Sequence, residues 1–235
     1  MGNYKNIVSL KVVANALAEL EHKIVFVGGA VVELYCDDPA RGEIRTTDDI
    51  DVVIELINSG SHADLEERLR QIGFKNDIES QVICRFKYHD IIVDIMPTDA
   101  RFLGFTNRWY KDGVDHAIFM TLENQATIQI FDVAYFLASK IEALKSERRG
   151  KDFRLNSDFE DIIYIFDNST YLLSAILQAE IEVKTYLKNE IVQLLQRPNI
   201  DEEITANLEF INSNKRKDRI VSIWKTIIQE TAGNT

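Results

Sequence analysis

The sequence predicts a mixed α/β fold, in which a small mixed-sheet domain precedes a helical C-terminal domain. Up to residue 131, short apolar runs of strand length alternate with segments of helical periodicity, and from residue 132 onward helical periodicity dominates. The chain has 235 residues, of which 46% are hydrophobic, and this is enough to bury a core. We therefore expect two domains, residues 1–131 and residues 132–235.

The first half begins with a predicted helix and a predicted strand. Residues 7–21 repeat apolar side chains at helical spacing, and residues 23–27 form a short apolar run that ends at Gly28-Gly29. The second pattern is typical of a buried strand followed by a glycine turn. The next elements are expected in this order: a short helix over 30–36, a strand over 50–54, and an amphipathic helix over 62–72 that Gly73 closes.

A β-hairpin and two further strands complete the predicted sheet. Residues 82–87 and 91–95 are rich in residues that favour β-strands, and Tyr88-His89-Asp90 separates them. This pattern indicates a hairpin. Residues 114–120 and 126–131 are expected to add strands. In the second half, the segments expected to be helical are 133–147, 157–167, 170–187, 188–196, 201–211 and 216–230.

Composition excludes several classes of protein. The net charge is −11, whereas a module that only held nucleic acid through phosphate contacts would usually be basic. No apolar run reaches the roughly 18 residues of a membrane helix, and the N-terminal segment lacks the apolar core of a signal peptide. Cys36 and Cys84 have no partner Cys or His at metal-ligand spacing, which favours two buried thiols in a reducing compartment. We expect a cytoplasmic protein without a membrane partner.

The most informative stretch is RTTDDIDVVI, at residues 45–54. Asp49 and Asp51 are two residues apart, so on a strand their side chains share one face, while Ile50 and Val52 point into the core. Two carboxylates on one face repel each other and favour a cation between them. Magnesium takes oxygen ligands, and it usually binds through one or two carboxylates plus the phosphates of a substrate.

An Asp-x-Asp pair by itself is weak support, because an acidic chain can produce one in a solvated turn. Here the pair begins a buried strand, and Asp94 stands alone in the apolar run at 91–96. A lone buried carboxylate is costly unless it is paired or binds a metal. If its strand lies beside that of Asp49 and Asp51, the three carboxylates suit two metal ions about 3.5–4 Å apart. The earlier turn at Gly28-Gly29 would let backbone N–H groups approach a triphosphate.

These residues resemble the motifs of a known superfamily. The sequence FVGGA at 26–30, followed by RTTDDID at 45–51, is similar to the motif pair of the polymerase-β nucleotidyltransferases. The gap between the glycines and the aspartates, and the residues of the aspartate motif itself, are most similar to the AbiEii/AbiGii and MenT group. Members of this group are often toxins of bacterial toxin–antitoxin or phage-defence systems. The resemblance implies a nucleotidyltransferase domain at 1–131, an NTP substrate, Mg²⁺ in a two-metal site, and transfer of a nucleoside monophosphate to an acceptor hydroxyl.

The second half resembles the same group at two motifs. ASKIEAL at 138–144 matches a helix that carries a lysine, Lys140. SDFEDI at 157–162 matches an acidic motif, except that Ser157 stands where the group has lysine. A Lys-Asp pair occurs earlier, at 151–152, and we favour Asp158 for the acidic position.

The resemblance also implies a role for each matching residue. Asp49 and Asp51 would bind the metals, and Asp94 would complete the second metal site and take the proton of the acceptor hydroxyl. Gly28 and Gly29 would hold the phosphates, and Lys140 would meet the triphosphate as a point charge. Arg45 and Thr47 would shape the site near the nucleotide.

Each of these roles has a structural alternative. Lys140 could be an exposed helix lysine, Arg45 could pair with a neighbouring aspartate, and Asp158 could be a helix N-cap. A basic run (Lys145, Arg148, Arg149, Lys151 and Arg154) could hold a phosphate backbone or be a solvated loop.

Three functional hypotheses follow. The first is a toxin that modifies RNA, for example the 3′ end of tRNA, and that is partnered by an antitoxin. The second is a nucleotidyltransferase that modifies a small molecule such as an aminoglycoside, since an acidic surface suits a cationic acceptor. The third is a non-catalytic binding protein with the same fold, against which the three carboxylates argue.

Overall fold

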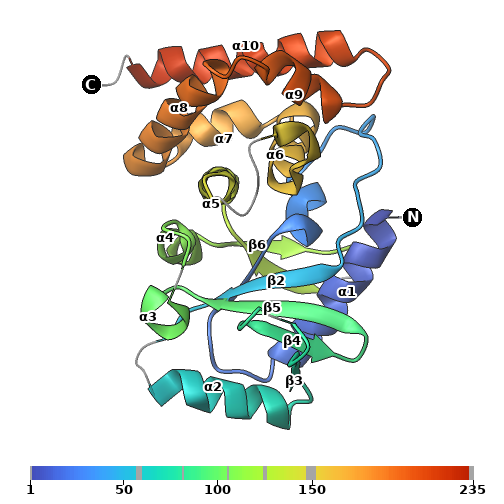
Figure 1. Ribbon diagram of the computed structural model, residues 1–235, viewed down its shortest axis with the longest axis vertical. Coiled ribbons are helices and arrows are strands. Elements are labelled where there is room, and N and C mark those ends of the chain that lie inside the picture. The colour runs from blue at the N-terminus through green and yellow to red at the C-terminus, as the bar shows by residue number, and fades with distance from the viewer. Residues whose placement is uncertain are drawn as a thin grey trace. The chain divides into compact units, whose positions relative to one another are not determined.

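The computed structural model describes residues 2–56, 60–80, 82–104, 106–123, 126–146 and 152–232 (Figure 1). The chain forms two compact units. The first contains residues 1–31 and 43–132, and the second contains residues 32–42 and 133–235. By its contacts, the segment 32–42 thus belongs with the second unit. The boundary between independently folding domains at residue 131 stays a prediction.

The first unit is built on a mixed sheet, as the sequence predicts. In the described residues its seven strands have the order β3-β4-β5-β2-β1-β7-β6. The pairs β2–β5 and β1–β7 are parallel, and the other pairs are antiparallel. The strands are β1 Ile24–Val27, β2 Asp49–Ile54, β3 Lys75–Asn76, β4 Arg85–Tyr88, β5 Ile91–Pro97, β6 Ile118–Thr121 and β7 Thr127–Ile130.

The expected hairpin is confirmed, because β4 and β5 pair antiparallel across a turn at His89 and Asp90. Its alternation sends Phe86 and Ile95 to one face of the sheet, where they line a small cavity together with Leu65 of the helix α2, Gly60–Gln71. The alternate positions of the two strands, which include Arg85 on β4 and Asp94 on β5, point to the other face. The helix α2 therefore covers the apolar face of these strands and leaves the polar face available for a site.

Other elements of the first unit differ in detail from the prediction. The segment expected as a helix over 30–36 is a 3-10 helix, η1 Gly29–Tyr35, whose residues from 32 onward group with the second unit. The strand expected over 114–120 is wrong at its start, since α4 ends at Asp115 and β6 begins at Ile118. The helices of this unit are α1 Gly2–Leu17, α2, α3 Ala100–Leu103 and α4 Tyr110–Asp115. The short α3 and α4 were not expected.

The second unit is helical (Figure 1). Its elements are α5 Val133–Leu144, η3 Phe153–Leu155, α6 Ser157–Asn168, α7 Leu172–Gln178, α8 Ile181–Leu195, α9 Ile200–Ala206 and α10 Ser213–Ala232. α5 packs against α6, α7 and α8, and α10 packs against α6 to α9. No helix among the described residues is both long and apolar enough to cross a membrane. Of the expected segment 133–147, residue 147 lies outside the described residues.

The single helix expected over 170–187 is wrong. The chain leaves the helical conformation at Ala179, with φ −64° and ψ 162°, and its N–H bonds back to the Ile176 carbonyl. The helix α8 then runs through the boundary expected between 187 and 188. Residues 170–187 hold no Pro or Gly that would mark this break, and α7 and α8 each pack separately on α10.

Polar contacts attach the segment 32–42 to the helices of its unit. The Asp37 carboxylate accepts hydrogen bonds from the backbone N–H of Thr170, at 2.7 Å, and from its hydroxyl, at 2.5 Å. The Tyr164 hydroxyl donates to the Gly42 carbonyl at 2.8 Å. These bonds span more than 100 residues of sequence, which is why the segment groups with the helical unit.

Both cysteines are free and buried, as expected. Burial raises the pKa of Cys36 well above its ordinary value and raises that of Cys84 to about 11, to which the nearby Asp94 charge adds. At pH 8 roughly one Cys84 thiol in a thousand is then ionised. We expect iodoacetamide to label the native protein far more slowly at pH 8 than the protein in guanidinium, and the rate to rise with pH. Equal rates would contradict this burial, and single Cys→Ala variants would assign each reaction.

Candidate active site

Three carboxylates meet on one face of the sheet. In the parallel pair of β2 and β5, Asp51 lies directly opposite Asp94. Asp49 lies two residues before Asp51 on β2, so its side chain is on the same face. Asp94 is buried, and the Asp49 side chain is 34% exposed. The predicted neighbourhood of these three strand residues is therefore confirmed, while their metal-binding role stays a prediction.

An arginine that the sequence analysis missed lies among the carboxylates. Arg85 is opposite Asp94 in the hairpin, and its Nε and Nη2 donate to the two Asp94 carboxylate oxygens at 2.8 and 2.7 Å. Nη2 also donates to Asp49 Oδ2 at 3.0 Å. The hairpin register was the signal that could have identified Arg85, since a basic residue directly opposite a buried aspartate can form an ion pair with it across the strands.

The electrostatics of the cluster are those of a site with excess negative charge. Burial raises the pKa of Asp49 above its usual range, and the Asp94 charge adds to this, whereas Arg85 opposes it. Hydrogen bonds to Asp94 raise the pKa of Arg85, which therefore stays charged. One guanidinium shared by two carboxylates beside a third leaves the cluster negative, and a further cation is favoured there.

The glycine turn packs directly against this cluster. Gly28 has φ +73°, and a Cβ at this position would overlap the Asp51 carboxyl group, with Asp51 Cγ only 2.6 Å away. A Cβ at Gly29 would lie 2.5 Å from Thr47 Cγ2 and 2.7 Å from Arg45 Nη2. The structure thus brings five of the predicted site residues together, and only glycine fits at the two turn positions.

A buried asparagine fixes the segment before β2. Asn6 of α1 accepts a hydrogen bond from the backbone N–H of Thr47 at 3.2 Å, and its amide donates to the Arg45 carbonyl at 3.3 Å. The Thr47 hydroxyl donates to the Asp49 carbonyl at 3.1 Å. Sequence reasoning missed Asn6, because the contact spans about 40 residues and no local pattern marks it.

Lys140 and Asp158 lie in the helical unit, where they pair with each other. Lys140 Nζ donates to Asp158 Oδ1 at 2.9 Å and to Asp161 Oδ2 at 2.7 Å, and all three side chains are buried. Burial alone would lower the pKa of Lys140, but the Asp161 and Asp158 charges outweigh it and raise the pKa above its ordinary value. Asp161 was not among the predicted site residues, although its i, i+3 spacing from Asp158 places it on the same helix face.

The structural alternatives for these two residues are wrong. Lys140 is not an exposed lysine, since only 9% of its surface is accessible. Asp158 is not the N-cap of α6, because the Asn156 side chain accepts from the backbone N–H groups of Asp158 and Phe159. Asp152, the other candidate for the acidic position, is exposed and pairs with Arg154, and hydrogen bonds from Arg154 lower its pKa to about 2.

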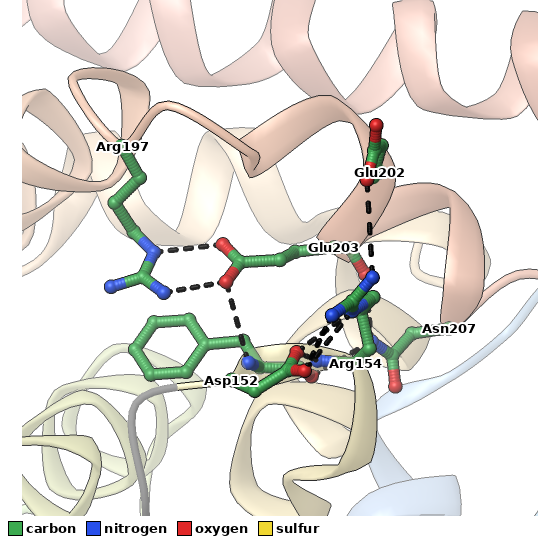
Figure 2. A network of polar contacts seen from close by, with 7 residues as sticks. Asp152, Arg154, Arg197, Glu202, Glu203 and Asn207 are labelled. Atoms are coloured by element: carbon green, nitrogen blue, oxygen red, sulfur yellow. Dashed lines mark hydrogen bonds and ion pairs between the residues drawn. The ribbon is translucent and has the colours of Figure 1, made fainter.

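The described members of the basic run are neutralised by acidic neighbours. Lys145 pairs with Glu142 and Glu190 at 3.3 and 2.7 Å. Figure 2 shows Arg154 between Asp152 and Glu202, beside the buried Glu203, which binds Arg197. Arg148, Arg149 and Lys151 lie outside the described residues. Lys145 and Arg154 therefore add little net positive charge for a nucleic-acid backbone.

The carboxylate cluster fits a divalent cation, because its residues are carboxylates and all three lie on the same face of the sheet. Carboxylate oxygens on two adjacent strands are ligands that magnesium prefers. As the side chains stand, no three His, Cys, Asp or Glu groups in the described ranges are arranged as metal ligands. Arg85 instead bridges Asp94 and Asp49, so ion binding at these oxygens requires an exchange of hydrogen bonds.

The mixed sheet, the Asp-x-Asp strand beside a third aspartate, and the glycine turn packed on them define the nucleotidyltransferase class. The family model for the nucleotidyl transferase AbiEii toxin, of a type IV toxin–antitoxin system, matches residues 12–229. The chain belongs to this family, which confirms the resemblance seen in its motifs. It is a nucleotidyltransferase, and enzymes of this kind generally use an NTP and a divalent metal.

Solved structures support the fold. An antigenic nucleotidyltransferase-like protein from Paracoccidioides brasiliensis matches with a TM-score of 0.53 and 19% identity, over 87% of this chain and 94% of that one. A candidate nucleotidyltransferase from Helicobacter pylori matches with a TM-score of 0.53 and 11% identity, over 99% and 97%. JHP933 from Helicobacter pylori has a TM-score of 0.53 and 7% identity, over 98% and 94%. None of the curated proteins matches the chain.

Proposed function

We propose that the enzyme transfers a nucleoside monophosphate from an NTP to an acceptor hydroxyl in a Mg²⁺-dependent reaction at Asp49, Asp51 and Asp94. The observation that carries this proposal is the register that sets Asp51 opposite Asp94, with Asp49 on the same face. This arrangement offers carboxylate oxygens from two adjacent strands to the same region of space. Two bound magnesium ions would stabilise the attacking and leaving oxygens of an in-line displacement.

The residues around the carboxylates have complementary proposed roles. Asp94 accepts the proton of the attacking hydroxyl. Gly28 and Gly29 let the triphosphate approach the backbone beside Asp51, and a Cβ at Gly28 would overlap the Asp51 carboxyl group. Arg45 and Thr47 bound the nucleotide site, and Asn6 holds their segment in place through its hydrogen bonds to Thr47 N–H and the Arg45 carbonyl. Positioning and charge neutralisation supply most of the catalysis in phosphoryl-type transfer.

Lys140 and Asp158 are proposed to act together in the same reaction. Lys140 keeps its positive charge because two aspartates surround it, and a triphosphate is a stronger anion than either aspartate. In this proposal Lys140 exchanges a carboxylate contact for a phosphate contact when NTP binds. Asp158 keeps the ammonium group oriented when the nucleotide is absent.

The proposed acceptor is the hydroxyl of an RNA, such as the 3′ end of tRNA, and the proposed biological role is that of a cytoplasmic toxin held in check by an antitoxin protein. The family's type IV toxin–antitoxin description supports the toxin and the antitoxin. A small cationic acceptor is the second candidate. Two observations favour it: the net charge of −11 and the acidic partners of Lys145 and Arg154.

The test is an incubation of the purified protein with Mg²⁺, each labelled NTP in turn, and total tRNA. We expect label in RNA from one preferred NTP. We expect EDTA to remove this activity, and the Asp49→Asn/Asp51→Asn variant to lower it on the order of 10³-fold or more, because charge stabilisation by the metals is lost. The exposed Asp90 of the hairpin turn provides the control Asp90→Asn, which removes one carboxylate outside the cluster and should stay active.

Each other outcome has a distinct meaning. Transfer to a cationic small molecule in place of RNA would retain the chemistry and change the acceptor. NTP binding without transfer to any acceptor would contradict the RNA proposal. Absence of both Mg²⁺-dependent NTP binding and transfer would overturn the proposed reaction.

A further inference from the structure

Arg85 donates three hydrogen bonds to the carboxylate cluster, and no step of the proposed reaction uses it. Its guanidinium engages both oxygens of Asp94 and one oxygen of Asp49. Three of the four carboxylate oxygens of these two residues are therefore occupied. These are the oxygens that the proposed function assigns to metal binding.

The position of Arg85 follows from the sheet and does not depend on a loop. Arg85 and Asp94 are cross-strand partners in the hairpin, and Asp94 and Asp51 are partners in the next pair of strands. The row Arg85–Asp94–Asp51 thus crosses three adjacent strands on one face. The arginine side chain is only 22% exposed, so the sheet holds its charge beside the carboxylates.

Arg85 and a divalent cation satisfy the same electrostatic need. Arg85 is the positive charge that lies within hydrogen-bond distance of both the Asp94 and the Asp49 carboxylates. An ion at the cluster would supply a larger positive charge to the same oxygens. Because a guanidinium and a metal ion cannot occupy the same lone pairs, binding of one weakens binding of the other.

We propose that Arg85 is an internal counter-ion that competes with the divalent metal for Asp94 and Asp49, and so holds the metal affinity of the nucleotide-free enzyme low. This inference rests on the proposed metal-binding role of the carboxylates. When metal enters together with the NTP, Arg85 gives up Asp49 first, because it holds Asp49 by one bond of 3.0 Å and Asp94 by two shorter bonds. Nη2 keeps its hydrogen bond to Asp94 Oδ2, and its freed N–H then lies beside the site, where the anionic triphosphate can replace Asp49 as its partner.

The test measures Mn²⁺ binding to the nucleotide-free protein by electron paramagnetic resonance, as a probe for Mg²⁺. If Arg85 occupies the oxygens nine-tenths of the time, its removal raises the apparent affinity about tenfold. We expect Arg85→Gln to bind Mn²⁺ roughly tenfold more tightly than the wild type, and Arg85→Lys to lie between them, since lysine keeps the charge without the bidentate fork.

Lys87→Gln is the matched control. Lys87 lies two residues further along β4, on the same face as Arg85, and its ion-pair partners are Asp77 and Glu79 instead of the cluster carboxylates. This variant therefore loses the same charge from the same strand without removing a contact to the cluster. Its Mn²⁺ affinity should equal that of the wild type. An equal gain in Lys87→Gln would reduce the effect to net charge and overturn the proposal.

Folding and the underlying site are checked separately. Circular dichroism establishes that each variant is folded at the temperature of the measurement. If Arg85→Gln is not folded, Arg85→Lys is the variant that tests the proposal. Unchanged or weaker Mn²⁺ binding in the folded Arg85 variants overturns the competition and makes Arg85 a positioning residue for Asp94. If Asp94→Asn binds Mn²⁺ as well as the wild type does, the proposed carboxylate site itself fails.

Discussion

Replacement of Gly28 with alanine is expected to lower nucleotidyl transfer by at least about 100-fold, because a displacement of about 1 Å in an active site can cost this much. A Cβ at residue 28 would overlap the Asp51 carboxyl group, and the backbone there has φ +73°, which L side chains rarely adopt. Asp51 is held on β2 between β1 and β5, so the strand cannot move aside without disrupting both pairings. The carboxylate must rotate away, and the cluster loses its geometry.

Gly104→Ala separates the steric effect from the backbone effect. Gly104 has φ +76° at the C-terminus of α3, and a Cβ there would meet no atom within 4 Å. Both variants should lose roughly 1–2 kcal/mol of stability through the backbone alone, as measured by urea unfolding. Only Gly28→Ala should lose transfer. Equal activity of the two variants would show that Asp51 is not needed in its observed position.

Replacement of Lys140 with methionine is expected to destabilise the helical unit by about 3–5 kcal/mol, because Asp158 and Asp161 would remain buried without their cation. Thermal unfolding should report this as a Tm lower by roughly 10 °C. Lys145→Met is the control, five residues further along the chain and just after the end of α5. Its partners Glu142 and Glu190 are also carboxylates, but the Lys145 side chain is 45% exposed, and such surface pairs contribute about 1 kcal/mol or less.

The same variant tests the proposed contact between Lys140 and the triphosphate. At a temperature where circular dichroism shows Lys140→Met to be folded, we expect weaker NTP binding and slower transfer than in the wild type. A variant that is less stable but binds and transfers normally would limit Lys140 to a structural role. The measured quantities are the Kd for the NTP and the rate of label transfer at saturating acceptor.

Local patterns were sufficient to predict most elements, and they failed where long-range packing decides. The apolar run before Gly28-Gly29 and the β-rich runs at 82–87 and 91–95 predict β1 and the hairpin, because both depend on neighbours in sequence, although β4 begins only at Arg85. The break at Ala179 was missed, since propensity favours helix throughout 170–187. The start of β6 was misplaced for a similar reason: Val114 is buried as part of α4, not of a strand.

The family and the carboxylates could also be predicted from the sequence alone. Asp49 and Asp51 are two apart on a strand, and the period of two residues puts them on one face whatever surrounds them. Asp94 could be flagged as a lone acid in an apolar run, but its place opposite Asp51 depends on which strands pair. The hairpin register could have paired Arg85 with Asp94. Arg85 reaches Asp49 over 36 residues of sequence and Asn6 reaches Thr47 over 41, and no local periodicity encodes these contacts.

The sequence by itself determined the fold class, the order of most elements and the residues that belong to the family's motifs, because these follow from local periodicity and spacing. Only the tertiary structure decided that Arg85 shares the carboxylates, that Gly28 and Gly29 pack on Asp51, Arg45 and Thr47, and that Lys140 is enclosed by Asp158 and Asp161. The physical reason is that strand order, register and helix packing bring distant side chains within hydrogen-bond range. These arrangements are fixed by burial of the whole core and not by any one segment.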